Sequence, residues 1–190
     1  MVILEYKTFG VSKILQTRRL ILRKLTVKDA PFILQLLNTE SFKKYVGDRK
    51  IYNLDAAENY ILNGVLRSYT DNGFGLWLFQ LKTDMTAIGI CGLIKREGLQ
   101  DIDIGFAMLP EFEKNGYAFE IASATLKYGH RKLGIGRIVA ITTKDNKQSI
   151  KLLVKIGLQY ERDTHLPNDV TPLMLFGNWK TVGASDLLIK

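Results

Sequence analysis

The segment from Asp101 to Thr143 constrains the fold of this chain more than any other stretch. A short apolar, β-rich run covers 101–109, and a loop at 113–118 contains a glycine. An amphipathic helix pattern follows over 116–132, and a second β-rich run spans 137–143. The segment therefore predicts a strand, a loop, a helix that packs on a sheet, and a second strand.

The loop Glu113–Ala118 has the features of a phosphate-binding turn. Gly116 lacks a Cβ atom, so the backbone can approach an anion closely. The unpaired N–H groups at the start of the following helix, with a partial positive charge of about +0.5, would attract that anion. A single glycine before a helix usually marks only a turn, so the loop alone leaves both interpretations open.

Helical and β-rich patterns occupy the rest of the chain. Thr26–Asp29 fits a capping box, but Pro31 would then lie awkwardly deep in the helix, which leaves Asp29 as an alternative cap. The runs between 74 and 109 predict an antiparallel meander. Helices are expected at 54–68 and 147–156, and strands at 18–25, 74–81, 87–94, 158–163 and 171–176.

Composition indicates one compact domain over residues 1–190. The chain has 190 residues, of which 46% are hydrophobic and 24% are charged, as in ordinary globular proteins. The single cysteine, Cys91, excludes an internal disulfide and lies in an apolar stretch, where an inert thiol is expected. No window approaches the roughly 18 apolar residues of a membrane span, and residues 1–10 lack a leader pattern, so we expect a cytoplasmic protein.

The chain is basic, with a net charge of +8 at pH 7. Its Lys and Arg residues are scattered, without a block of like charges, so a specific nucleic-acid site is not expected. The charge favours anionic ligands in general. No histidine or acid spacing predicts a metal site.

Four motifs follow one another along the chain: Thr17–Arg23, Ile102–Phe106, Gly116–Ala118, and Asn146–Ser149 with Lys155–Leu158. In order and spacing they resemble the acyl-CoA-binding core of the GNAT acetyltransferases, in particular the branch that acetylates ribosomal-protein N-termini. The resemblance covers most of the chain. It implies an α/β GNAT fold: a mixed, mostly antiparallel central sheet of about seven strands flanked by helices, with a splayed parallel strand pair that forms the acyl-CoA site.

The resemblance also implies acetyl-CoA as the cosubstrate. The pantetheine arm would lie between strands 101–109 and 137–143, held by backbone groups of Phe106, Met108 and Leu109. Asn146 and Ser149 occupy positions where the family contacts the pantetheine, although Asn146 is equally suited to cap a helix.

The CoA phosphates would bind at the loop. The family has Gln or Arg at the first loop position, where this chain has Glu113. A carboxylate facing a pyrophosphate would repel it, so we expect Glu113 to point to solvent. Binding would then rest on the backbone of Lys114, Asn115, Gly116, Tyr117 and Ala118.

Catalysis requires a neutral amine, and therefore a base or a water relay to one. Asp103 is the candidate base, since relatives carry an acid at this position; the alternative is a surface aspartate at a strand end. Many GNAT enzymes protonate the leaving thiolate with a Tyr, where this chain has Leu153. Ser149 is a weak candidate for that role, and a thiolate of pKa about 8.5 could also leave unaided.

The basicity of amines favours an α-amine as the acceptor. An α-amine of pKa about 7.7 is roughly one-sixth neutral at pH 7, against about one in a few thousand for a lysine amine. We therefore expect a protein or peptide N-terminus, or an amino acid. A polyamine or aminoglycoside stays open, as do a non-catalytic acyl-CoA-binding protein and, on charge alone, a nucleic-acid-binding protein. The sequence leaves the oligomeric state open, a homodimer included.

Overall fold

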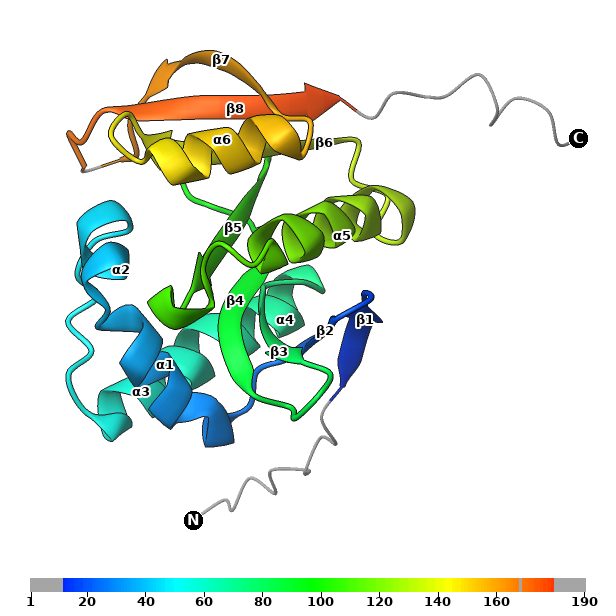
Figure 1. Cartoon of the computed structure of the whole chain (residues 1–190). Helices are drawn as coiled ribbons and strands as arrows, with labels where there is room; N and C mark the ends of the chain where they lie inside the picture. The colour runs from blue at the N-terminus through cyan, green and yellow to red at the C-terminus, as the bar shows by residue number, and fades with distance from the viewer. Residues whose placement is uncertain (1–11, 168, 180–190) are drawn as a thin grey trace, which may run out of the picture.

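All eight strands join one sheet in the order β1-β2-β3-β4-β5-β6-β8-β7 (Figure 1). The computed structural model describes residues 12–167 and 169–179. Neighbouring strands are antiparallel except β5 and β6. The strands are β1 (Lys13–Gln16), β2 (Leu20–Lys24), β3 (Leu76–Leu81), β4 (Ala87–Ile94), β5 (Ile102–Met108), β6 (Arg137–Thr143), β7 (Gln159–Thr164) and β8 (Leu173–Trp179).

The predicted mixed, mostly antiparallel sheet and its meander of β3, β4 and β5 are confirmed. The described residues form eight strands instead of about seven. The expected first strand at 18–25 is β2, and a further strand, β1, precedes it and pairs with it around a turn at residues 17–19. The short, half-exposed β1 carries too little apolar pattern to be recognised from sequence.

The parallel pair β5 and β6 splays apart, as expected. Ladder pairing is limited to Ile102 with Ile138 and Asp103 with Val139. Beyond these pairs β5 continues along β4 to Met108, while β6 continues along β8. The backbone groups on the β6 side of residues 104–108 therefore lack a strand partner in the described chain.

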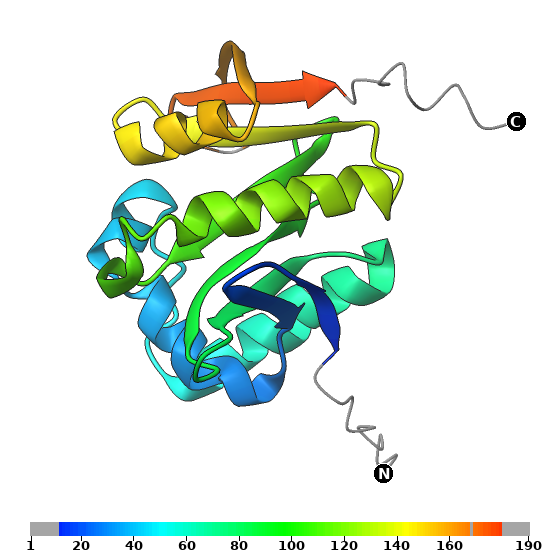
Figure 2. The same ribbon diagram turned by 45° about the vertical axis from the view of Figure 1, so that its right-hand side comes forward.

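Helices cover both faces of the sheet (Figures 1 and 2). On one face lie α5 (Tyr117–Arg131) and α6 (Lys147–Lys155). The other face is covered by α1 (Ala30–Leu37), by the segment from α3 (Leu54–Tyr60) to α4 (Arg67–Asn72), and, at its margin, by α2 (Glu40–Tyr45). The expected helix 54–68 is longer than predicted, and a π-helical stretch at Ile61–Leu66 interrupts it.

Strand alternation divides the core into two hydrophobic clusters. Trp77 and Phe79 of β3 face α5 and pack in the cluster with Ile121. Leu78, between them, faces the opposite way and packs with Ile33 of α1. Each of these side chains is at most 1% exposed. Because successive strand residues point to opposite faces, one strand anchors helices on both sides.

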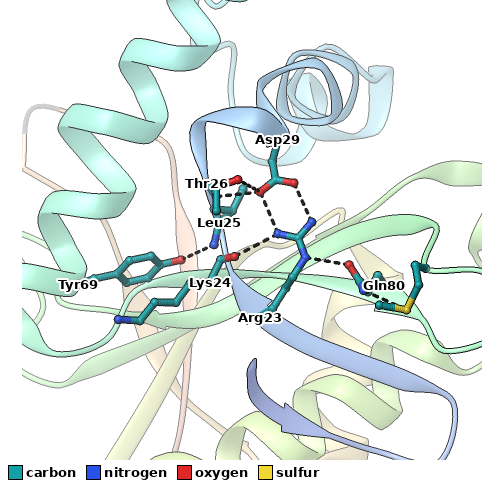
Figure 3. Close-up of polar contacts among 8 residues, drawn as sticks. Arg23, Lys24, Leu25, Thr26, Asp29, Tyr69 and Gln80 are labelled. Carbon is teal, nitrogen blue, oxygen red and sulfur yellow. Dashed lines mark hydrogen bonds and ion pairs between the residues drawn. The ribbon is translucent and has the colours of Figure 1, made fainter. Parts of the chain in front are cut away.

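A partly buried ion pair fixes the start of α1 against the sheet (Figure 3). Arg23 of β2 donates from Nη1 and Nη2 to the two carboxylate oxygens of Asp29 at 2.9 and 2.7 Å, and from Nε to Gln80 at 2.8 Å. Burial would raise the pKa of Asp29, but hydrogen bonds from Arg23 and Thr26 outweigh it and hold the pKa below its ordinary value. Thr26 caps the 3-10 turn at 27–29, and Asp29 caps α1 with Pro31 in its first turn, so both alternatives for the cap hold.

Tyr69 ties α4 to the same strand junction (Figure 3). Its hydroxyl accepts a hydrogen bond from the backbone N–H of Leu25 at 3.1 Å and donates to the carbonyl of Leu76. The helices on this face are thereby held to β2 and β3. These contacts also help to place α1 and α2, which form one wall of a cavity at the end of β5.

Candidate functional site

A cavity of about 420 Å³ lies at the carboxyl end of β5, where β5 and β6 have separated. Four segments of the chain meet around it. The lining comprises Phe106, Ala107 and Met108 of β5; Glu113, Lys114, Gly116, Ala118 and Phe119 at the start of α5; Asn146, Gln148, Ser149, Lys151, Leu152 and Lys155 of α6; and Leu36, Thr39, Ser41, Phe42, Tyr45 and Val46 of α1 and α2.

The loop before α5 has the backbone shape of an anion site. Gly116 is the N-cap residue of the 15-residue helix α5 and has a left-handed φ of 78°. Its carbonyl accepts the N–H of Glu120 at 3.1 Å, so the helix begins directly after it. Lys114 is also left-handed, with φ 63°. The first N–H groups of α5 have no preceding helical carbonyl to accept them, and their binding of a phosphate stays a prediction.

Three lysines surround this end of the cavity: Lys114, Lys151 and Lys155. The Nζ atom of Lys155 lies 4.5 Å from the centroid of the Phe119 ring, which is 36% exposed. The sequence favoured a solvated face for the two α6 lysines; they are exposed, but they also line the cavity. Glu113 is half-buried in the lining, which differs from its expected place in solvent.

Asn146 acts as the N-cap of α6 and also lines the cavity. Its Oδ1 accepts the N–H of Ser149 at 3.0 Å. Both side chains reach the lining, so the cap does not remove them from the site. Leu153, in the place of the family's Tyr, is 1% exposed and belongs to the main hydrophobic cluster, while its neighbour Leu152 lines the cavity.

Asp103 is not among the residues that line the cavity. It is 1% exposed, so the alternative of a surface aspartate is wrong. Its Oδ2 accepts two hydrogen bonds from Arg96, at 2.7 and 2.9 Å, and Oδ1 is buried as well. Burial raises the pKa of the carboxyl, and the Arg96 guanidinium opposes that shift. A role as base stays a prediction.

Three further predicted contacts lie outside the lining. Leu109 is buried, and its N–H donates to the carbonyl of Ile88 at 2.9 Å. The side chain of Asn115 donates back to the loop carbonyls of residues 112 and 113. The ring of Tyr117 lies under the guanidinium of Arg19 at 4.4 Å. Asn115 and Tyr117 therefore shape the loop with their side chains and can offer a ligand only backbone groups.

From the sequence, only the segment 32–69 was expected as the side on which the acceptor would enter, and the individual residues of the α1–α2 wall were not predicted. It places the largely apolar Leu36, Phe42, Tyr45 and Val46 opposite β5. Thr39 shapes this wall by capping α2, since its hydroxyl accepts the N–H of Phe42 at 3.3 Å. The Thr-x-x-Phe spacing was a local signal for the cap, but the contact with β5 depends on tertiary packing.

Comparison with known proteins identifies the class. The family model described as an acetyltransferase (GNAT) domain matches residues 19–159. The "uncharacterized N-acetyltransferase YoaA" of Bacillus subtilis (strain 168) is 31% identical over 150 residues, which cover 78% of this chain and 84% of that protein. The chain therefore belongs to the GNAT acetyltransferases, and it is an acetyl-CoA-dependent N-acetyltransferase.

Solved structures share the fold at low identity. A ribosomal L7/L12 alpha-N-protein acetyltransferase, RimL, in complex with coenzyme A has a TM-score of 0.74 and 15% identity, covering 88% of this chain and 98% of that one. A chimera of the spermidine N-acetyltransferase SpeG from Vibrio cholerae and hSSAT has a TM-score of 0.69 and 18% identity, covering 84% and 95%. Among residues 12–167 and 169–179, no helix is long and apolar enough to cross a membrane.

Proposed function

We propose that this N-acetyltransferase acts on the α-amine of a protein or peptide N-terminus, or of an amino acid. The observation that carries the proposal is the chemistry of the cavity. Among its described lining residues the one carboxylate is Glu113, which belongs to the loop before α5. A polyamine or aminoglycoside brings several cations, and cations held in a protein cavity require acidic partners. The α1–α2 wall offers apolar and hydroxyl side chains instead.

The lack of a strong base in the described lining supports the same acceptor. An α-amine of pKa about 7.7 is already roughly one-sixth neutral at pH 7. A lysine amine of pKa about 10.4 is neutral in about one molecule in a few thousand. A site whose one lining carboxylate, Glu113, belongs to the loop before α5 can therefore use an α-amine, with water carrying the released proton, far more readily than a lysine.

The donor would bind along the lysine-rich end of the cavity. The pyrophosphate would accept hydrogen bonds from the N–H groups at the start of α5, and the lysines around it would balance its charge. The nucleotide would lie against the exposed ring of Phe119. The pantetheine arm would pair with the backbone of residues 106–108 on the side that β6 has left.

In the proposed reaction the amine enters beside α1 and α2, and its lone pair attacks the thioester carbonyl carbon. A backbone N–H of β5 stabilises the oxygen as it gains negative charge. The C–N bond forms, the C–S bond breaks, and CoA leaves as a thiolate. The amine loses its proton to water, and the thiolate takes a proton from solvent, directly or relayed by the hydroxyl of Ser149, which lines the cavity and regains its own proton from solvent.

The two solved neighbours are named for different acceptors. One is named for a ribosomal-protein α-amine and the other for spermidine, yet both share this fold. The fold therefore does not choose between these acceptors. The scarcity of acids in the lining favours the first.

The test is a titration of the purified protein with acetyl-CoA, followed by an assay of thiol release with an acceptor panel. The panel contains peptides of varied N-terminal residue, the same peptides with a blocked N-terminus, free amino acids, spermidine and an aminoglycoside. The proposal predicts release that requires a free α-amine and rises with pH toward about 8. Release with spermidine or the aminoglycoside alone would contradict the acceptor, and binding without release would contradict the enzymatic role.

A further inference from the structure

Arg19, in the turn between β1 and β2, makes four contacts with the start of α5. Its Nε donates to Oε2 of Glu120 at 2.7 Å, and its backbone N–H donates to Oε1 of the same carboxylate at 2.8 Å. Its Nη1 donates to the carbonyl of Asn115 at 3.0 Å, and its guanidinium lies 4.4 Å from the centroid of the Tyr117 ring. The hydroxyl of Thr17 adds a 2.6 Å hydrogen bond to Glu120.

Through these contacts one side chain holds residues on both sides of Gly116 in the loop Glu113–Ala118, the proposed phosphate loop. Arg19 binds the carbonyl of Asn115 and the ring of Tyr117, which flank Gly116 on both sides. Its Nη2 lies 3.5 Å from the position that a Cβ atom would take on Gly116. The left-handed backbone at Gly116, which lines the cavity, is therefore contacted by Arg19, which does not line it.

The same contacts also neutralise a negative charge at the start of α5. Glu120 lies in the first turn of the helix, where its carboxylate interacts favourably with the helix dipole but would repel an anionic ligand. Burial would raise the pKa of Glu120, but the hydrogen bonds from Thr17 and Arg19 hold it below its ordinary value, so the carboxylate stays charged. Arg19 balances that charge at 2.7 Å, and the pair is partly screened from water, with exposed side-chain fractions of 33% and 18%.

We propose that Arg19 is a positioning residue for acetyl-CoA: it sets the shape of the phosphate loop and cancels the Glu120 charge next to the bound phosphates. The inference rests on the proposed binding of CoA phosphates at the start of α5. It assigns a role in cosubstrate affinity to the β1–β2 hairpin, which does not touch the cavity.

The test compares CoA affinity, by calorimetry, and kcat and KM for acetyl-CoA among five proteins. They are the wild type, Arg19→Ala, Arg19→Lys, Glu120→Gln and the double variant that combines Arg19→Ala with Glu120→Gln. Arg18→Ala is the matched control, because Arg18 carries the same charge in the same turn, is exposed and has no ion pair in the described chain. Thermal unfolding of each variant checks the fold.

Arg19→Ala should raise the Kd and the KM for acetyl-CoA about fivefold at low salt, with kcat changed less than about twofold. Arg19→Lys should fall between it and the wild type, because lysine keeps the charge without the planar fork. Glu120→Gln breaks the same ion pair but removes the negative charge, so its affinity should equal or exceed that of the wild type. The double variant should recover part of the loss, and all differences should shrink in about 1 M salt.

A role confined to folding predicts another pattern: Glu120→Gln would weaken CoA binding as much as Arg19→Ala, and salt would not change the difference. That result overturns the inference, as does a loss in Arg18→Ala equal to that in Arg19→Ala. If Arg19→Ala does not fold, Glu120→Gln and Arg19→Lys decide by the same criteria. A wild type that does not bind CoA overturns the proposed function together with the inference, whereas binding that is unchanged in Arg19→Ala overturns the inference alone.

Discussion

Substitutions at Gly116 test whether the loop before α5 binds the CoA phosphates, because the effect of backbone strain can be separated there from the effect of steric clash. A Cβ atom at this position would meet only Nη2 of Arg19, at 3.5 Å, which is an ordinary contact. The φ of 78° is the obstacle, since an L-residue in this region costs about 1–2 kcal/mol, and more when it is β-branched. If the loop relaxes to relieve this strain, CoA binding must restore it, which raises the Kd about five- to thirtyfold.

The assay is calorimetric titration with CoA of Gly116→Ala and Gly116→Val. Gly134→Ala is the matched control, because Gly134 is also left-handed, with φ 69°, has no atom within 4 Å of its added Cβ, and does not line the cavity. It should lose similar stability and no CoA affinity. The valine variant should bind more weakly than the alanine variant. Wild-type affinity in Gly116→Val, or an equal loss in Gly134→Ala, would refute the assignment of the loop.

Three further perturbations follow from single contacts. Asp29→Asn should lower the free energy of unfolding by about 1–3 kcal/mol at pH 7 in urea titrations. Because the pKa of Asp29 is lowered in the folded protein, its contribution to stability is present above pH 3.8 and is lost as the pH falls below that value. The stability difference between the variant and the wild type should therefore shrink at pH 3, and a constant difference would contradict this. Asp103→Asn should lower turnover most at low pH with CoA affinity intact if Asp103 relays a proton, and an unchanged rate would remove it from the mechanism. Phe119→Leu should raise the KM for acetyl-CoA about fivefold. The KM for acetyl-pantetheine, which lacks the nucleotide, should not change. An equal rise in KM for both donors would show that the ring does not contact the nucleotide.

Local patterns were sufficient for much of the fold. The runs at 87–94 and 137–143 match β4 and β6 in full, because their apolar residues are bounded by clear turns. The helix start at Gly116 and the cap at Asn146 were equally local. The hairpin strand β1 and the π-helical stretch at 61–66 were not predicted, since β1 depends on pairing with β2 and the π turn lies within an unbroken helical pattern.

The site was predictable where it depends on backbone shape, and less so where it depends on packing. The loop and Asn146 carry their geometry in a few adjacent residues. Arg19 and the α1–α2 wall lie about 60 residues or more away in the chain from the residues that they face, and no spacing rule brings them there. Asp103 was correctly placed on β5, but its burial against Arg96 follows from the packing of the sheet.

The α-amine acceptor is tested most directly by incubating the enzyme with acetyl-CoA and a peptide that has both a free α-amine and an internal lysine, and by locating the acetyl group with tandem mass spectrometry. We expect one acetyl group on the α-nitrogen, formed only with acetyl-CoA, and no product from the same peptide with a blocked N-terminus. Acetylation of the lysine in place of the α-amine would contradict it.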